Sequence, residues 1–301
     1  MPDVLLWRAM TRGKIKKAGR FVFLALFLAL ALMLFWRGGA DSGFVWREAE
    51  ERTAGIVMPP PSPAPAPSAS PVSTRPKVAI IIDDMGLDRK KSARAVSLPP
   101  PVTLSYLAYA PNAQAQADEA RARGHEIFLH LPWQSAHEAD AGPHVLLAGE
   151  APDVLRQKLK ENLDAFRGYV GVNNHMGSLF SQDRAGLDVV MAELKRRGLV
   201  FVDSRTSPRT QAESAAHAAG VAAAHRDVFI DDDPSPESVS AQLREVERAA
   251  RRKGAVIAIG HPKEATLTAL ESWLPTLAAK GLELVPATAI ISPEENKGET
   301  P

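Results

Sequence analysis

From residue 77 onward, the hydrophobic and polar positions alternate between short apolar runs and longer stretches of helical pattern. Four times a helical stretch ends in a basic or small-residue turn and a glycine, and an apolar run follows at once. The glycines lie where a helix C-terminus favours a left-handed residue; they are Gly124, Gly198, Gly254 and Gly281. Such regular alternation predicts an α/β domain with a parallel sheet covered by helices.

The spacing of these patterns sets the expected elements. The predicted helices cover residues 88–97, 112–123, 152–166, 184–197, 236–253 and 264–280. The predicted strands cover residues 77–83, 102–107, 126–131, 169–174, 199–203, 221–230, 255–260 and 282–286. Seven or eight strand–helix units in roughly 215 residues favour a closed or nearly closed (β/α) barrel over an open sheet.

The N-terminal part of the chain follows a different pattern. Residues 21–36 are sixteen uncharged apolar residues, preceded by the basic segment 1–20 and followed by Arg37. As a helix this run would be about 24 Å long, slightly short of a ~30 Å hydrocarbon core, and flanking arginines can reach the interface. The pattern favours a transmembrane signal-anchor with residues 1–20 in the cytoplasm. The alternative is a signal peptide cleaved near residues 38–40.

Residues 37–76 are expected to be a linker, because they include a run rich in proline, alanine and serine that favours an extended, semi-rigid chain. The folded domain is expected over residues 77–292, and residues 293–301 should be a disordered tail. With the anchor in a bacterial inner membrane, the folded domain would lie in the periplasm. Cleavage of the N-terminal segment would instead release it into the periplasm.

Charge and cysteine content narrow the chemistry. Residues 1–40 carry a net charge of +6, so the formal net charge of +1 leaves −5 for the rest of the chain. An acidic body without a basic cluster argues against a nucleic-acid partner. The chain has no cysteine, which excludes disulfides, zinc–thiolate sites and cysteine nucleophiles. Any metal would therefore be bound by histidines and carboxylates.

Two aspartates follow the apolar run of residues 78–82, whose β-branched composition is typical of a strand buried on both faces. Adjacent carboxylates such as Asp83 and Asp84 are costly to desolvate there unless a cation, a proton or hydrogen bonds compensate them. Taken alone, the pair is equally compatible with a helix N-cap or a solvated turn. In an extended strand the two would point to opposite faces, so the backbone must turn at Asp84 if both serve one centre.

Residues that bind metals or move protons end several other predicted strands. They are His130, Asn173, Asn174, His175, Asp203, His225 with Asp227, and His261. The carboxyl ends of barrel strands meet at one face, so these side chains should converge. Histidines and carboxylates without thiols indicate a hydrolytic metal site with an open position for substrate. A serine hydrolase is excluded because no G-x-S-x-G motif is present. Two neighbouring carboxylates also cannot flank a glycosidic bond with the separation of ~5 Å or more that a glycosidase needs.

Five segments occur in a fixed order over residues 77–292: IIDDMG, GHEIFLHLPW, GVNNHMGS, FVDSRT and AIGHP. Together they resemble the divergent polysaccharide deacetylases, a branch of the NodB-type carbohydrate esterase superfamily. The resemblance implies a distorted (β/α) barrel and metal-dependent removal of acetyl groups from N-acetylated sugars. It further implies that Asp83 is the catalytic base, that Asp84 is a metal ligand and that His261 is the general acid.

The resemblance also assigns His130 as the first histidine of an H-x-x-x-H metal motif. The second histidine of that motif is replaced by Gln134, and His175 is the obvious substitute. Asp203 either orients a ligand or the acid, or caps a turn after its strand. The remaining supporting candidates are His225, as a further ligand, and Asn174.

The expected function is a membrane-anchored periplasmic deacetylase that acts on an N-acetylated carbohydrate of the cell envelope. Its cofactor would be one divalent metal, with zinc expected and manganese, cobalt or nickel as alternatives. Its partners would be an N-acetylated glycan and, through residues 21–36, the inner membrane. The alternative, which Gln134 favours, is a catalytically inactive glycan-binding or scaffold protein with the same fold. A metal-dependent hydrolase of another amide is a third reading.

Overall fold

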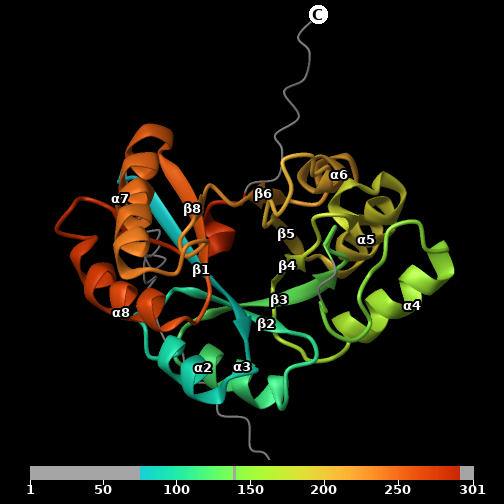
Figure 1. The fold of residues 1–301 in the computed structure, drawn as a ribbon, viewed down its shortest axis with the longest axis horizontal. Coiled ribbons are helices and arrows are strands. Elements are labelled where there is room, and N and C mark those ends of the chain that lie inside the picture. Colours follow the sequence, from blue (N-terminus) through green and yellow to red (C-terminus); the bar gives the residue numbers. More distant parts are fainter. Residues whose placement is uncertain (1–74, 138–139, 292–301) are drawn as a thin grey trace, which may run out of the picture. The chain divides into compact units, whose positions relative to one another are not determined.

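The computed structural model of the protein describes residues 75–137 and 140–291 (Figure 1). The predicted signal-anchor at residues 21–36, the segments on either side of it and the C-terminal tail lie outside these residues. Among the helices of the described ranges, none combines the length and the apolar character needed to cross a membrane.

One parallel sheet organises the described part of the chain. Its strands are β1 Lys77–Met85, β2 Thr103–Leu107, β3 Glu126–Trp133, β4 Gly171–Met176, β5 Val200–Asp203, β6 Ala223–His225, β7 Val228–Phe229, β8 Ala255–Gly260 and β9 Glu283–Leu284. They follow in the order β6-β5-β4-β3-β2-β1-β8-β7, and β9 pairs with the start of β1. Every pairing is parallel, which confirms the predicted class of fold.

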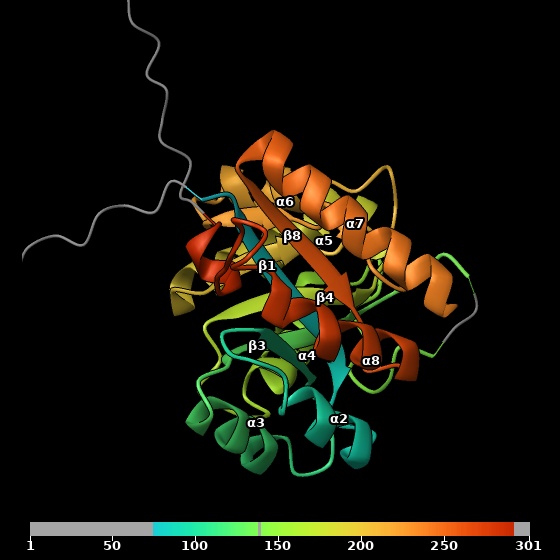
Figure 2. The ribbon, with the colours of Figure 1, turned by 90° about the vertical axis from the view of Figure 1, so that its left-hand side faces the viewer.

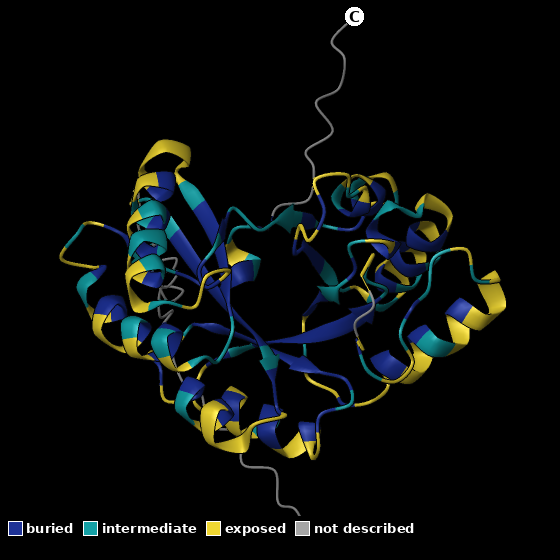
Figure 3. Ribbon diagram, viewed as in Figure 1, coloured by how far each residue is buried: buried dark blue, intermediate teal, exposed yellow. Residues whose placement is uncertain are grey.

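The helices lie along the outer side of this curled sheet (Figures 1 and 2). They are α2 Arg89–Ala95, α3 Ala113–Ala122, α4 Pro152–Leu163, α5 Arg184–Arg197, α6 Ala212–Ala218, α7 Pro236–Lys253 and α8 Glu264–Trp273, with short 3-10 turns at Phe180–Gln182, Leu274–Thr276 and Ala287–Ala289. Figure 3 shows the strands mostly buried and each helix exposed on its outward face. The amphipathic patterns of the sequence therefore correspond to helices that cover the sheet.

The structure differs from the prediction at two helices. The sequence does not predict α6, whose alanine-rich residues lack a clear apolar stripe. The expected helix over 264–280 ends at Trp273 and continues only as a 3-10 turn. Pro275 lies in that turn, and a proline lacks the N–H that an α-helix would use there.

The predicted strand over residues 221–230 is two short strands at opposite edges of the sheet. β6 pairs with β5, and β7 pairs with β8. Between them the Arg226 N–H donates to the Asp203 carbonyl of β5, and the next N–H, of Asp227, donates to the Ile257 carbonyl of β8. Because adjacent residues bond to opposite edges, the sheet must be curled far toward a ring. This is the geometry of a distorted barrel.

The core has two parts, because successive side chains of a strand point to opposite faces. In β1, Val78, Ile80 and Ile82 pack against the outer helices. Ala79 and Ile81 face the inside of the curled sheet and belong to a separate inner cluster. The apolar run that is continuous in the sequence therefore packs into two separate cores, one on each face of the sheet.

The last described segment fills the inside of the curled sheet near the start of the strands. Val285, Ala287 and Ile291 belong to the inner cluster. The Ala287 N–H donates to the hydroxyl of Thr103 at 3.1 Å, which ties the segment to β2. With that end filled, the C-terminal ends of the strands are left as the place for a ligand.

Candidate metal centre and active site

The inner face of each strand continues to its C-terminal end and there becomes polar. In β1, Asp83 follows Ala79 and Ile81 on the inner face, and in β3 His130 follows Phe128. The pairing of β3 with β4 places Asn173 opposite His130. The same two-residue alternation that builds the inner core therefore gathers the polar side chains at one end of it.

The backbone turns at Asp84, which two neighbouring aspartates require if both are to reach one centre. Asp84 has φ +54°, in the left-handed region, and the register of β1 with β2 shifts between Ile82 and Met85. Aspartate tolerates this region better than most residues. The bulge lets Asp83 and Asp84 reach the same cleft instead of opposite faces of the sheet.

Asp84, His130 and His175 form one cluster, in which each residue offers one ligand atom and these three atoms lie within 4.8 Å of one another. The Asp84 Oδ1 atom is 3.4 Å from Nε2 of His130 and 3.0 Å from Nδ1 of His175. The two imidazole rings lie edge to face, with centroids 5.0 Å apart. His130 is buried, and His175 is largely so.

Asn173 connects this cluster to Asp83. Its Oδ1 accepts a hydrogen bond from Ser105 at 2.6 Å and lies 3.0 Å from Nδ1 of His130. Its Nδ2 donates to Oδ1 of Asp83 at 2.8 Å. Since an amide oxygen can only accept, the proton of His130 must be on Nδ1, which leaves the Nε2 lone pair directed toward Asp84. Such outer hydrogen bonds are typical of histidines that bind metals.

The residues present fit a divalent cation. The Asp84 Oδ1 atom is buried, yet no hydrogen bond of acceptable geometry reaches it. A buried carboxylate oxygen without a donor is costly, and a cation between it and the two histidines would remove that cost. Two imidazole nitrogens and one carboxylate oxygen are a known zinc ligand set that leaves a position open for water or substrate.

The electrostatics separate the two aspartates. Burial raises the pKa of Asp83, and the nearby histidines only partly oppose this. Burial acts in the same direction on Asp84, but His130 and His175 outweigh it and hold the pKa of this carboxyl well below its usual range. Asp84 therefore stays ionised, as a metal ligand must, while Asp83 has the higher affinity for a proton that a general base needs.

His261 lies beside the cluster and is held by an aspartate that sequence reasoning does not single out. Its Nδ1 is 2.9 Å from Oδ1 of Asp231, and its backbone N–H donates to Oδ2 of Asp231 at 2.8 Å. Asp231 is fully buried and also accepts from the hydroxyl of Thr266 at 2.7 Å. Burial lowers the pKa of His261, but Asp231 and Asp83 outweigh this and raise it. The sequence signal that could have revealed Asp231 is its position just after the strand β7. The sequence pattern does not separate β7 from β6, so this signal is hidden.

These groups line a cleft of about 560 Å³ at the C-terminal ends of the strands. Asp83, Asp84, His130, His175 and His261 all contribute to it, and so does Asn174. The Asn174 side chain fixes the rim, because its Oδ1 accepts from the Ser204 N–H and its Nδ2 donates to the Met176 carbonyl. The cleft thus has room for a small ligand next to the cluster.

Three residues singled out in the sequence lie elsewhere. The Gln134 side chain accepts from the Ala148 N–H at 2.8 Å and so belongs to the loop after β3. Asp203 is buried and caps the turn after β5, where it accepts from the Arg205 N–H and the Thr210 hydroxyl, both at 2.8 Å. His225 pairs with Glu213 on the outer edge at 2.8 Å. None of the three lines the cleft.

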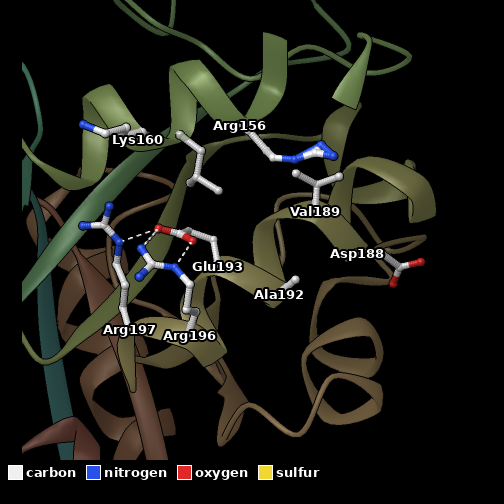
Figure 4. A pocket seen from close by; sticks show the side chains of 9 residues that line it. Arg156, Lys160, Asp188, Val189, Ala192, Glu193, Arg196 and Arg197 are labelled. Carbon is white, nitrogen blue, oxygen red and sulfur yellow. Dashed lines mark hydrogen bonds and ion pairs between the residues drawn. The ribbon is translucent and has the colours of Figure 1, made fainter. Parts of the chain in front are cut away.

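A larger hollow of about 630 Å³ lies between α4 and α5 on the outer side of the sheet (Figure 4). Its charged groups are already paired: Glu193 binds both Arg196 and Arg197, and Arg197 also binds Asp164. No histidine lines it. Although this hollow is larger than the cleft, the cluster of histidines and aspartates lies in the cleft.

The sequence and the fold both match known proteins. The family model described as "divergent polysaccharide deacetylase" matches residues 80–291. The uncharacterized protein YibQ of Escherichia coli (strain K12) is 32% identical over 225 residues, which cover 75% of this chain and 70% of that protein. An uncharacterized protein of Haemophilus influenzae is also 32% identical, over 67% of this chain and 72% of its own length.

Among solved structures, the uncharacterized protein ATU2773 from Agrobacterium tumefaciens C58 is similar to this chain with a TM-score of 0.71 and 30% identity. The match covers 74% of this chain and 92% of that protein. A putative cellobiose-phosphate cleavage protein from Enterococcus faecalis V583 shares the fold alone, with a TM-score of 0.53 and 14% identity. In that case the match covers 72% of this chain and all of the other.

Proposed function

The chain belongs to the divergent polysaccharide deacetylase family, and from this we propose that it removes acetyl groups from an N-acetylated carbohydrate with one divalent cation. The observation that carries the proposal is the cluster of Asp84, His130 and His175 beside Asp83 and His261 in one cleft. Zinc is the cation we expect, and manganese, cobalt and nickel suit the same ligands.

The chain's own residues supply the binding and the proton transfers. When bound, the cation polarises the amide carbonyl and makes a water molecule more acidic. Asp83 takes the proton of the attacking water, since its carboxyl is buried, has a raised pKa and is held in place by Asn173. Its Oδ2 is 3.6 Å from His130 Nε2, so the base lies next to the ligand cluster.

His261 gives the proton that the leaving amine needs. Asp231 holds its Nδ1, so Nε2 is the nitrogen that is free toward the cleft. That nitrogen is 3.8 Å from Oδ2 of Asp84. Asp231 keeps His261 protonated at higher pH, which suits a general acid.

The proposal includes a location in the cell. The apolar segment 21–36 and the basic residues before it support an anchor in a bacterial inner membrane, with the catalytic domain in the periplasm and an envelope carbohydrate as substrate. Mass spectrometry of the protein from membrane fractions tests this. An intact N-terminus supports the anchor, whereas a mature protein that begins near residue 38 supports secretion.

Acetate release tests the chemistry against the alternative of a glycan-binding protein. We expect the full-length protein to release acetate from N-acetylated oligosaccharides. Asp83→Asn and His261→Ala should each lower this rate at least 100-fold, the order of general acid–base contributions. Glycan binding, measured by calorimetry, should persist in both variants. Binding by the wild type without any acetate release would instead identify a glycan-binding protein.

A further inference from the structure

Arg226 is a cation in the cleft whose role the proposed chemistry leaves open. It lies between β6 and β7 and lines the cleft together with Phe229 and His261. The guanidinium carbon is 4.5 Å from the centre of the Phe229 ring, so one face of the group is covered. The Phe229 ring is in turn 5.6 Å from the ring of His261. Arg226 is therefore on the side of the cleft that holds the general acid.

One edge of the guanidinium is fixed by the backbone. Nε donates to the Ser204 carbonyl at 2.7 Å, and Nη2 donates to the Arg205 carbonyl at 2.9 Å. These donors form the side edge of the planar group. The end edge, with one N–H of Nη1 and the second N–H of Nη2, has no hydrogen-bond partner among residues 75–137 and 140–291. It is a preorganised two-donor fork.

The charge of Arg226 also lacks a direct partner. Asp83 and Asp232 line the same cleft, but in the described ranges no carboxylate oxygen lies within 4.0 Å of the guanidinium. Burial lowers the pKa of Arg226 more than these acids raise it, so the cation is incompletely compensated. Arg205, exposed at the rim, lies 3.5 Å from a carboxylate oxygen of Glu213, so its charge is already paired. An arginine fixed by two carbonyls, with its end edge free, is suited to bidentate contact with a carboxylate.

We propose that Arg226 binds a carboxylate of the substrate, so that the cleft selects an acidic glycan. The acid His261 faces the amine that remains on the sugar, and Phe229 links it to Arg226. The carboxylate therefore belongs to the sugar residue that carries the amide or to its neighbour, not to the acyl group. This inference rests on the proposed function only in taking the ligand to be an N-acetylated glycan.

Equilibrium binding tests the inference without depending on catalysis. Full-length protein treated with a chelator, so that no turnover occurs, is titrated with a tetrasaccharide of alternating N-acetylglucosamine and glucuronate. The matched probe is the same tetrasaccharide with its carboxyl groups reduced to alcohols. At low salt we expect the acidic probe to bind at least roughly tenfold more tightly, as for a charge-assisted bidentate contact.

Variants then assign the preference to Arg226. Arg226→Gln should bring the ratio of the two Kd values close to one. Arg226→Lys should also reduce it, because an ammonium that bonds both carbonyls has one donor left. Arg209→Gln removes the same charge from an exposed residue of the neighbouring loop that does not line the cleft, and it should keep the wild-type ratio.

Two results would overturn the inference. One is a wild-type ratio near one. The other is a ratio that stays at its wild-type value in Arg226→Lys and in any folded Arg226→Gln protein, which would show that Arg226 only supports the loop or Asp83. Neither result bears on deacetylation itself, because acetate release from a neutral glycan is measured separately.

Discussion

At the scale of single residues, Asp83 and Asp84 differ because the backbone turns between them. Asp83 keeps the strand conformation, stays buried and bonds to Asn173. Asp84, at φ +54°, reaches the histidines and leaves one buried oxygen without a hydrogen bond of acceptable geometry. The two carboxyls therefore have opposite pKa shifts, which is the condition for one to act as base and the other as ligand.

The affinity for a metal should depend on the residues of the cluster and not on the total number of histidines in the chain. Changing a residue that only hydrogen-bonds to a metal ligand typically lowers metal affinity about 10–100-fold. Asp84→Asn and His175→Ala change ligands themselves, so each should lower zinc affinity by about 100-fold or more. His225→Ala is the matched control, because His225 pairs with Glu213 outside the cleft. Isothermal titration of the full-length protein measures this. Equal losses in His225→Ala and His175→Ala would contradict the assignment.

Zinc affinity should also rise with pH. Burial lowers the pKa of His130, but Asp83 and Asp84 outweigh this and raise it above the ordinary 6.5. A raised pKa keeps the imidazole protonated to higher pH, and the proton must leave before a metal can bind. Affinity should therefore increase as pH passes through and above 6.5, with proton release in calorimetry. A flat profile without proton release would argue against His130 as a ligand.

At the scale of elements, the strand ends could be predicted from the sequence and their exact partners could not. Apolar runs followed by aspartate or histidine identify the C-terminal parts of β1, β3, β4 and β8, although β1 continues to Met85 and β3 to Trp133. The break between β6 and β7 has no such signal, because it depends on hydrogen bonds to two distant strands. For that reason Asp231 and Arg226, which flank β7, become visible only in the structure.

Asp203 could cap a turn or orient a residue of the metal centre, and its residue type alone does not decide between these two roles. A capping role predicts that Asp203→Ala loses the bonds to the Arg205 N–H and the Thr210 hydroxyl, at a cost of about 1–3 kcal/mol in the free energy of unfolding. Denaturant unfolding measures this cost. Zinc stoichiometry should stay at its wild-type value, and its loss in a folded Asp203→Ala protein would show that Asp203 acts on the metal centre.

At the scale of the whole described domain, one end of the curled sheet is open and the other is filled by the last described segment. The sequence predicts the convergence of strand ends, because in any barrel of parallel strands they share a face. It does not predict that residues 285–291 fill the inside of the sheet, since the only sequence signal is a few apolar residues after β9. Long-range packing of this kind has no local pattern.

Ile291 tests that filling role. Ile291→Ala should lower the free energy of unfolding by about 2–4 kcal/mol, the usual cost of truncating a buried isoleucine. Leu87→Ala is the control, because Leu87 is 51% exposed and should change stability by less than about 0.5 kcal/mol. Thermal unfolding of both variants measures the difference. Similar melting temperatures for the two would mean that the segment does not stabilise the core.

We propose that this cleft performs metal-dependent deacetylation. The most direct measurement is acetate release from an N-acetylated oligosaccharide by the full-length protein, before chelation, after chelation and after stoichiometric zinc is restored. We expect release that stops on chelation and returns with zinc in the wild type but not in Asp84→Asn. Acetate release that continues unchanged after complete removal of the metal would contradict it.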